Sequence, residues 1–495
     1  MNLEFVPLGG TIDPLGKKPP IGGSAYALID RDKMSALLID CGAYPLSAEK
    51  RERQSELVVK ILESRISKLD ISKLPREERV VAGVKLLSLP RIPDLFTGDD
   101  LEIDLREMSE ESLPNIEILS GMREITVVVT HAHVDHIGTI VFLKRRFPHI
   151  KVLMTKATRD ISLWSWYDSL KVMRRLGQTP LFDSPDIKSL LSSITLVRES
   201  DAITAGPFEL TFTRAGHILG AIGVLVRGRD FGAPSIFFTG DTSITRQHSV
   251  GSAILPASRV DVLVTESTYA GRSHEGRDEV EMKLASDVER TLEGGGKVLF
   301  PSLSIGRPLE IYSILKRFGI TDRFDVYFDG SARDIAHIYA RHGNVSPVIL
   351  DRFIGGRKER ESVMTGDRPL VVIAPSGMLS GGFSVEYAVD WADDPKNMIA
   401  FSSFMDSCSP GYRLLRIPQG SFTHLYDNNL TLNARVVSYG LSAHLSHSEI
   451  IEVIDTLVPK ETFLVHGDKE GMEKVIEEAS TPARKTFLNT RYQLT

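Results

Sequence analysis

Short apolar runs alternate along the chain with longer amphipathic stretches, and several of the runs end in a small or acidic residue. Four of them close at Gly42, His133, Asp241 and Ser267. Runs of this kind, followed by polar residues, are typical of buried strands whose ends carry function. Charged stretches with helical character lie between them, at residues 161–176 and 279–292. The alternation predicts a layered α/β fold.

One stretch departs from this alternation. Residues 50–117 are rich in Glu, Lys and Arg, with Leu, Val and Ile at helical spacing in the first part and a looser acidic sequence after it. A charged amphipathic segment of this kind usually forms a solvated cover over another surface. We therefore expect a helical insertion here, and its sequence indicates no function.

Length and composition narrow the class of protein. A chain of 495 residues exceeds what one hydrophobic core usually supports, so two structural units are expected. No apolar run approaches the roughly 18 residues of a membrane-spanning helix. The first ten residues lack a secretory pattern, and Cys41 and Cys408 cannot form a disulfide framework. We expect a cytoplasmic protein without a membrane partner. The net charge of −6 neither favours nor excludes nucleic acid, because phosphate binding depends on local clusters of Lys and Arg.

The strongest chemical signal is the segment Thr-His-Ala-His-Val-Asp-His at residues 130–136, where a β-branched run ends. Four of its side chains can bind a metal: His131, His133, Asp135 and His136. Imidazole and carboxylate suit zinc and related divalent ions, and a loop can turn alternate ligands toward two centres. Burying four such groups without a metal would be costly. We interpret the isolated histidines, in contrast, as ordinary core or surface residues: His149, His248, His337, His342 and His424.

Three further residues complete a candidate ligand set. His217, Asp241 and His466 each follow an apolar run and lie beside a glycine. Glycine allows a positive φ angle and a close backbone approach, so such turns can aim a side chain into a shared cleft. Each of these signals is weak by itself.

In their order along the chain, these motifs resemble the metal-binding motifs of the metallo-β-lactamase superfamily. The resemblance implies one metal site made of His131, His133 and His217. It implies a second site made of Asp135, His136 and His466, with Asp241 bridging the two. Asp40 matches the superfamily's first motif, whose acid orients the metal loop without binding metal. The implied cofactors are two Zn²⁺ ions, with Mn²⁺ as an alternative.

About 160 residues between Thr268 and Val436 exceed what small members of the superfamily need, and they resemble the β-CASP insertion. The likeness rests on the segments at residues 266–269, 301–310, 376–382 and 442–444. It implies a metallo-β-lactamase αββα sandwich with an inserted β-CASP α/β domain. The implied borders place the sandwich in residues 1–268 and 434–495 and the insertion in residues 269–433.

The β-CASP motifs also indicate a substrate. Motifs A, B and C of the family correspond to Glu266, His444 and His466. A histidine at motif C is the RNA-processing pattern, whereas DNA-acting relatives of the Artemis type tend to have valine there. The residues that occupy these motifs resemble those of the cleavage-and-polyadenylation endonuclease subunit and its prokaryotic relatives more closely than those of RNase J. The resemblance therefore implies a zinc-dependent ribonuclease that cuts single-stranded RNA internally or from the 5′ end, and a homodimer.

The expected mechanism assigns four catalytic residues. Asp135 and Asp241 would position a hydroxide, and His444, oriented by Glu266, would protonate the leaving oxygen. We expect substrate contacts from Arg307, Ser376, Gly377 and Ser442, because a guanidinium and backbone N–H groups in glycine-rich turns suit phosphate.

Three alternatives stay open. A DNA nuclease of the repair type would keep the metal chemistry, and His466 argues against it. A small-molecule metallohydrolase would leave the pair of Glu266 and His444 without a purpose. A non-catalytic scaffold would be expected to lack ligands, and none is missing here.

Overall fold

The computed structural model describes residues 2–15, 21–44, 113–175, 180–230, 232–343, 352–402, 405, 407, 409–426 and 428–494. The insertion expected at residues 50–117 lies outside these residues, apart from its last five. The last two of those five begin the short 3₁₀ helix η3, Ile116–Leu119.

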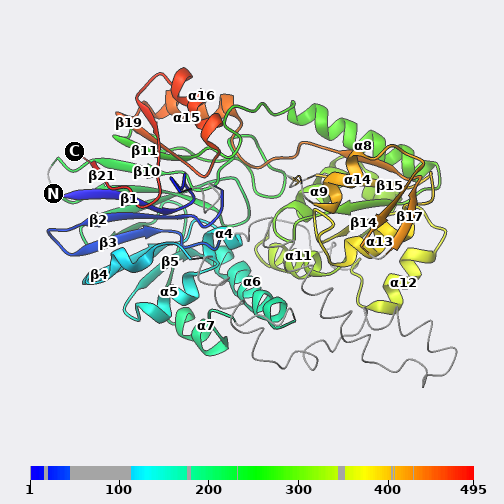
Figure 1. The fold of residues 1–495 in the computed structure, drawn as a ribbon, viewed down its shortest axis with the longest axis horizontal. Helices are drawn as coiled ribbons and strands as arrows, with labels where there is room; N and C mark the ends of the chain where they lie inside the picture. Colours follow the sequence, from blue (N-terminus) through cyan, green and yellow to red (C-terminus); the bar gives the residue numbers. More distant parts are fainter. Residues whose placement is uncertain are drawn as a thin grey trace.

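Two seven-stranded sheets form the larger part of the fold (Figure 1). The first has the order β21-β1-β2-β3-β4-β5-β6, with bounds Tyr492–Leu494, Leu3–Gly9, Ala25–Asp30, Ser35–Ile39, Glu124–Val128, Lys151–Thr155 and Ile194–Val197. The second has the order β20-β19-β11-β10-β9-β8-β7, with bounds Ala483–Lys485, Glu461–Val465, Val262–Glu266, Ser235–Phe238, Ile222–Gly228, Phe208–Arg214 and Ala202–Ala205. The four predicted strands before Gly42, His133, Asp241 and Ser267 correspond to β3, β4, β10 and β11 and are confirmed.

The two sheets pack face to face through a core that includes Phe5, Phe212 and Phe463. Helices cover both outer faces (Figure 1). The first sheet is covered by α4 (Val134–Ile137), α5 (Ile140–Arg146), α6 (Lys156–Arg175) and α7 (Ser184–Leu191), and the second by α15 (His447–Leu457) and α16 (Lys469–Glu478). This is the expected αββα sandwich, and α6 covers the predicted helical stretch at residues 161–176 up to Arg175. None of the described helices is both long enough and apolar enough to cross a lipid bilayer.

The inserted domain is built on a five-stranded parallel sheet of order β13-β14-β12-β15-β18. Its strands are Asp325–Phe328, Leu370–Ala374, Val298–Pro301, Met398–Phe401 and Arg435–Ser438. Its helices are α8 (Arg277–Glu293), α9 (Arg307–Arg317), α10 (Ile320–Arg323), α11 (Ser331–Arg341), α12 (Arg357–Thr365), α13 (Phe383–Trp391) and α14 (Pro410–Arg416). The helix predicted at residues 279–292 is α8. The expected fold class is confirmed, whereas the borders at residues 268 and 434 stay a prediction.

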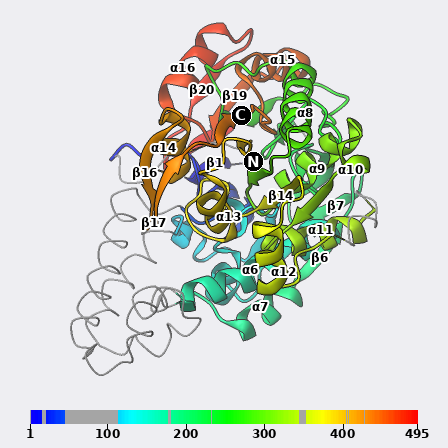
Figure 2. The same ribbon diagram turned by 90° about the vertical axis from the view of Figure 1, so that its right-hand side faces the viewer.

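Figure 2 shows the two flanks of the inserted domain. The hairpin of β16 (Ser421–Leu425) and β17 (Asn428–Leu432) lies beside α14 on one flank, and α8 to α11 lie on the other. From the flank with α8, α9 and α11, polar side chains contact the sandwich.

Buried ionic contacts join the sandwich to the inserted domain. His248 follows β10 in the sandwich, and its Nε2 lies 2.8 Å from Glu281 Oε2 on α8. Glu310 on α9 accepts hydrogen bonds from the backbone N–H groups of His248 and Ser249, both at 2.9 Å. Arg277 contacts both glutamates. Burial alone would raise the pKa of Glu281, but His248 and Arg277 outweigh it and lower that pKa to about 2.

Replacement of Glu281 by Gln should destabilise the folded protein in a pH-dependent way. A carboxylate with a lowered pKa stabilises the fold above its unfolded pKa, and that stability is lost as the pH falls toward the folded pKa. Glu281→Gln should therefore lower the free energy of unfolding by roughly 3 kcal/mol at pH 7 and by less than half of that at pH 3. Urea unfolding at both pH values measures the difference.

Glu279→Gln is the matched control, because Glu279 is exposed on the same helix. This variant should change the free energy of unfolding by less than about 0.5 kcal/mol. An equal, pH-independent loss in both variants would contradict the assigned role of Glu281.

Candidate metal centre

The ends of parallel strands from both sheets meet at one edge of the sandwich. Strands β3 and β4 are parallel neighbours in the first sheet, and β10, β11 and β19 are parallel neighbours in the second. The candidate residues Asp40, Asp241 and His466 follow β3, β10 and β19, and Glu266 ends β11. Side chains at the carboxyl ends of adjacent parallel strands can converge on a single crevice.

The loop after β4 has a tight local structure. His133 is the N-cap of α4, so Asp135 and His136 lie in the first helical turn, while His131 and His133 precede it. A Cβ atom at Gly42 would lie 1.6 Å from the carbonyl oxygen of Asp135. Only glycine fits where the β3 loop passes this close to α4. The packing of these two segments fixes the direction of the four candidate ligands.

Three histidines bring ring nitrogens together at the spacing of ligands on one ion. His133 Nδ1 lies 3.1 Å from His131 Nε2 and 3.1 Å from His217 Nε2. Two nitrogens bound to a tetrahedral zinc ion at about 2.0–2.1 Å lie roughly 3.3 Å apart. The donor set and its spacing therefore fit one zinc ion.

A second group lies beside the first. His466 Nε2 lies 3.3 Å and His136 Nε2 lies 3.9 Å from Asp135 Oδ2. The Oδ2 atom of Asp241 lies 3.4 Å from His136 Nε2 and 3.6 Å from His131 Nε2. One carboxylate oxygen thus lies next to a member of each group, which is the position that a bridging ligand needs.

Asp40 is buried behind this cluster. Its carboxylate accepts hydrogen bonds of 2.7 Å from Thr130 N, Thr130 Oγ1 and His136 Nδ1. Since a carboxylate can only accept, Nδ1 of His136 carries the proton, and Nε2 faces Asp241. Asp40 has a φ angle of 60°, which is unfavourable for a residue with a side chain and needs support from its surroundings.

Burial and neighbouring charges shift the pKa values of the cluster, so that some of its groups are neutral near pH 7 and others are charged. Burial lowers the pKa of His133 to about 4 and holds the pKa values of His131 and His217 well below their usual range. These three rings are therefore neutral near pH 7, the form in which imidazole binds a metal. Burial alone would raise the pKa of Asp241, but His136 and His466 outweigh it and hold that pKa well below its usual range.

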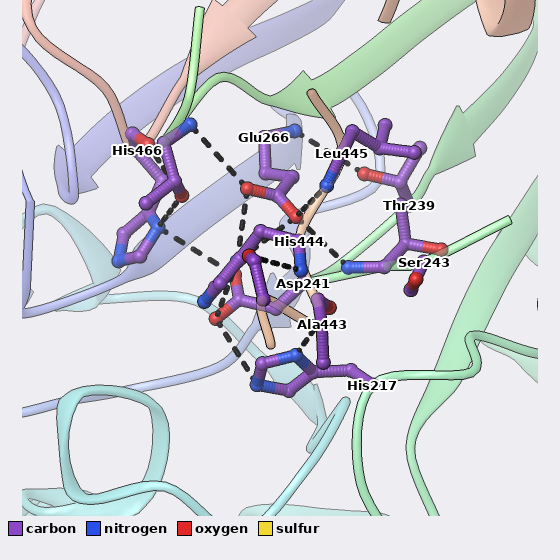
Figure 3. A network of polar contacts seen from close by, with 12 residues as sticks. His217, Thr239, Asp241, Ser243, Glu266, Ala443, His444, Leu445 and His466 are labelled. Carbon is purple, nitrogen blue, oxygen red and sulfur yellow. Dashed lines mark hydrogen bonds and ion pairs between the residues drawn. The ribbon is translucent and has the colours of Figure 1, made fainter. Parts of the chain in front are cut away.

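Glu266 and His444 form a pair beside Asp241 (Figure 3). Both carboxylate oxygens of Glu266 lie 3.0 Å from His444 Nδ1. Burial disfavours the charged imidazole, but Glu266 and then Asp241 outweigh it and raise the pKa of His444 to about 9. His444 is therefore protonated near pH 7 and can give up a proton to a bound molecule.

A cavity of about 610 Å³ connects the two domains and contains the candidate site. Asp135, His217 and His444 line it from the sandwich. Of the four expected substrate contacts, Arg307 and Ser442 line the cavity, whereas Ser376 and Gly377 do not. Gly377 instead packs behind the cavity wall, where a Cβ atom would lie 2.9 Å from the backbone nitrogen of Leu303.

Two residues without an assigned role in the sequence support the site. Thr268 Oγ1 lies 3.0 Å from His466 Nδ1, and His274 Nε2 lies 3.1 Å from the carbonyl oxygen of His444. Thr268 belongs to the segment at residues 266–269. Its position two residues after Glu266 could therefore have indicated from the sequence that it lies near the site. His274 lies outside every recognised motif, and only the fold brings it to His444.

Three protein-family models match the chain. They are described as the metallo-beta-lactamase superfamily (residues 115–302), the Beta-Casp domain (residues 309–414) and the Zn-dependent metallo-hydrolase RNA specificity domain (residues 429–486). The matched ranges follow one another along the chain, and they include parts of both domains.

The chain is also similar to curated proteins. "Transcription termination factor FttA" from Pyrococcus abyssi is 28% identical over 394 residues, which is 74% of this chain and 60% of that protein. "Cleavage and polyadenylation specificity factor 73" from Drosophila melanogaster is 26% identical over 382 residues, which is 74% of this chain and 55% of that protein. The chain thus spans about 60% of the length of such relatives.

A solved structure shares the fold. The "Crystal Structure of a Protein of Unknown Function from Enterococcus faecalis V583" covers all of both chains with a TM-score of 0.60 and 12% identity. The three family models, the αββα sandwich and the inserted parallel sheet show that the chain contains a metallo-β-lactamase domain with an inserted Beta-Casp domain, followed by a segment that matches the RNA specificity domain of Zn-dependent metallo-hydrolases.

Proposed function

We propose that the chain is a two-metal phosphodiester hydrolase that cleaves single-stranded RNA. The observation that carries the proposal is the position of Asp241, whose Oδ2 atom lies 3.6 Å from His131 Nε2 and 3.4 Å from His136 Nε2. A buried carboxylate between two histidine groups suits a pair of cations. His444, which is paired with Glu266, lies beside it and lines the same cavity as Asp241.

The chain's residues would hold two zinc ions, with manganese as an alternative. The first ion would be held by His131, His133 and His217, the second by Asp135, His136 and His466, with Asp241 between them. When bound, such ions supply a water of lowered pKa and positive charge next to a phosphodiester. Asp40 keeps His136 in the orientation and tautomer that binding needs.

His444 is proposed as the general acid. With Nδ1 bound to Glu266, Nε2 is the atom that can donate a proton to the leaving oxygen. The negative charge of Glu266 favours the protonated ring and holds its plane. Arg307 and Ser442 line the same cavity and would contact the substrate backbone.

Three arguments favour RNA over DNA. One family model is named for RNA specificity, motif C is a histidine, and the relative from Drosophila melanogaster is named for cleavage and polyadenylation. Neither the endonuclease mode nor the 5′ exonuclease mode is preferred. The homodimer and the cytoplasmic location expected from the sequence stay predictions.

Asp40→Ala should weaken zinc binding without removing a ligand. The change leaves His136 Nδ1 and Thr130 N without their acceptor, and loss of such a supporting contact typically costs about 10- to 100-fold in metal affinity. Competition with a chromophoric chelator measures it. Asp261→Ala removes a hydrogen-bonded acid that precedes β11, at the opposite end of the second sheet, and should leave zinc affinity unchanged. Equal affinity in wild type and Asp40→Ala would refute the assigned role of Asp40.

His444→Ala should keep both metal ions and lose turnover. General acid catalysis typically contributes about 10²- to 10⁴-fold, so kcat should fall within that range while zinc content stays the same. His424→Ala, at an exposed position on β16, is the control and should cleave at the wild-type rate. Full turnover in a His444→Ala protein that holds both ions would rule out the general-acid role.

Cleavage of matched end-labelled RNA and DNA tests the proposed function as a whole. The wild type, supplied with zinc or manganese, should cut RNA, and Asp135→Ala should not, because it loses a ligand of the second ion. Internal fragments would indicate an endonuclease, and a ladder from the 5′ end an exonuclease. Preferential cutting of DNA, or no cutting by a fully metallated protein, would contradict the proposal.

A further inference from the structure

The loop between β8 and β9 carries His217 and is held by its own domain on one side. His217 Nδ1 donates to the carbonyl oxygen of Ala443 at 2.8 Å. The hydroxyl groups of Thr155 and Thr158 both donate to the carbonyl oxygen of Gly220 at 2.9 Å. These contacts anchor the two ends of the segment at residues 217–220 and leave its middle to another partner.

The inserted domain supplies that partner. The backbone N–H of Leu219 donates to the hydroxyl oxygen of Tyr339 on α11 at 3.1 Å. Tyr339 and Leu219 are both buried, with 0% and 5% of their surface exposed. Next to this contact, a Cβ atom at Gly306 would lie 2.7 Å from Ile218 Cγ2. The start of α9 therefore packs directly on the His217 loop.

The loop that follows Asp241 docks on the same helices. Glu310 on α9 accepts from the backbone N–H and the hydroxyl of Ser249, at 2.9 Å and 2.7 Å. A Cβ atom at Gly216 would lie 2.5 Å from both Ala253 N and the carbonyl oxygen of Ser243, so the two loops also pack on each other. Two segments that carry proposed metal ligands thus rest on the inserted domain.

We propose that Tyr339 is a positioning residue for the metal centre, through which docking of the inserted domain sets the affinity of the three-histidine site. The inference rests on the metal assignment in the proposed function. Without the hydroxyl, the N–H of Leu219 would be buried and unpaired, a state that favours a different loop conformation. That conformation would move His217 away from His131 and His133. By linkage, zinc bound to His217 in turn favours the docked domain.

Tyr339→Phe tests this, because it removes only the hydroxyl oxygen. Metal-free protein is titrated with zinc against a chromophoric chelator, and the variant should bind one of its two ions about 10-fold more weakly. The affinity for the other ion should stay within about twofold of the wild-type value. Cobalt(II) is the second probe, because its visible absorption reports ligand geometry independently of catalysis. The absorption of cobalt bound at the three-histidine site should differ between Tyr339→Phe and the wild type.

Tyr387→Phe is the matched control. Tyr387 is also fully buried in the inserted domain, and its hydroxyl donates to Asp329 rather than to a ligand-bearing loop. This variant should lower the thermal midpoint by a similar amount and leave zinc affinity and the cobalt spectrum unchanged. Weaker binding of one zinc ion in Tyr339→Phe, together with unchanged zinc binding in Tyr387→Phe, supports the positioning role.

Two results would overturn the inference. One is a zinc affinity of Tyr339→Phe equal to wild type while the thermal midpoint falls, which would make Tyr339 a packing residue only. The other is an equal loss of affinity in both variants, which would indicate general destabilisation. RNA cleavage is assayed separately. A wild type that binds two zinc ions without cutting RNA would contradict the proposed function. The zinc affinities of the two variants would still decide the role of Tyr339.

Discussion

The burial of one carboxylate among imidazoles is the constraint on which the site depends. Asp241 is 3% exposed, and its oxygens lie between 3.4 and 4.0 Å from ring nitrogens of His131, His136, His217, His444 and His466. Charges removed from water are tolerated only where opposite charge compensates them. Asp40 and His466 also have φ angles of 60° and 53°, so the surroundings hold the backbone in an unfavourable conformation. Positive charge held among these side chains would therefore stabilise the site.

Strand order explains how residues so far apart in the chain reach this point. His131 follows β4, in one sheet, and His466 follows β19, in the other. The sheets pack face to face with the ends of their parallel strands at one edge, so a side chain one to three residues beyond the strand end reaches the shared crevice. The sandwich core built around Phe5 and Phe463 therefore holds the ligand geometry as well as the fold.

The inserted domain contributes more than a cavity wall. Its α9 and α11 contact the loops that carry His217 and Asp241, and its α8 contributes Glu281 to the buried ionic contacts with His248. Since the cavity is lined from both domains, a substrate held there would touch the surface that also supports the ligand loops. Under the proposed function, these few contacts would link substrate binding, domain docking and metal binding.

The sequence by itself determined the strands before the functional turns, the fold class and the candidate ligands, because these depend on local apolar runs and on motifs of adjacent residues such as those at 130–136. It could not place Tyr339, His274 or the contacts of His248, since their partners lie far away in the chain and their residue types are common in helices and loops. It also could not separate Arg307 and Ser442, which line the cavity, from Ser376 and Gly377, which do not. Those distinctions depend on how two domains pack, and packing is decided by long-range contacts that no local pattern records.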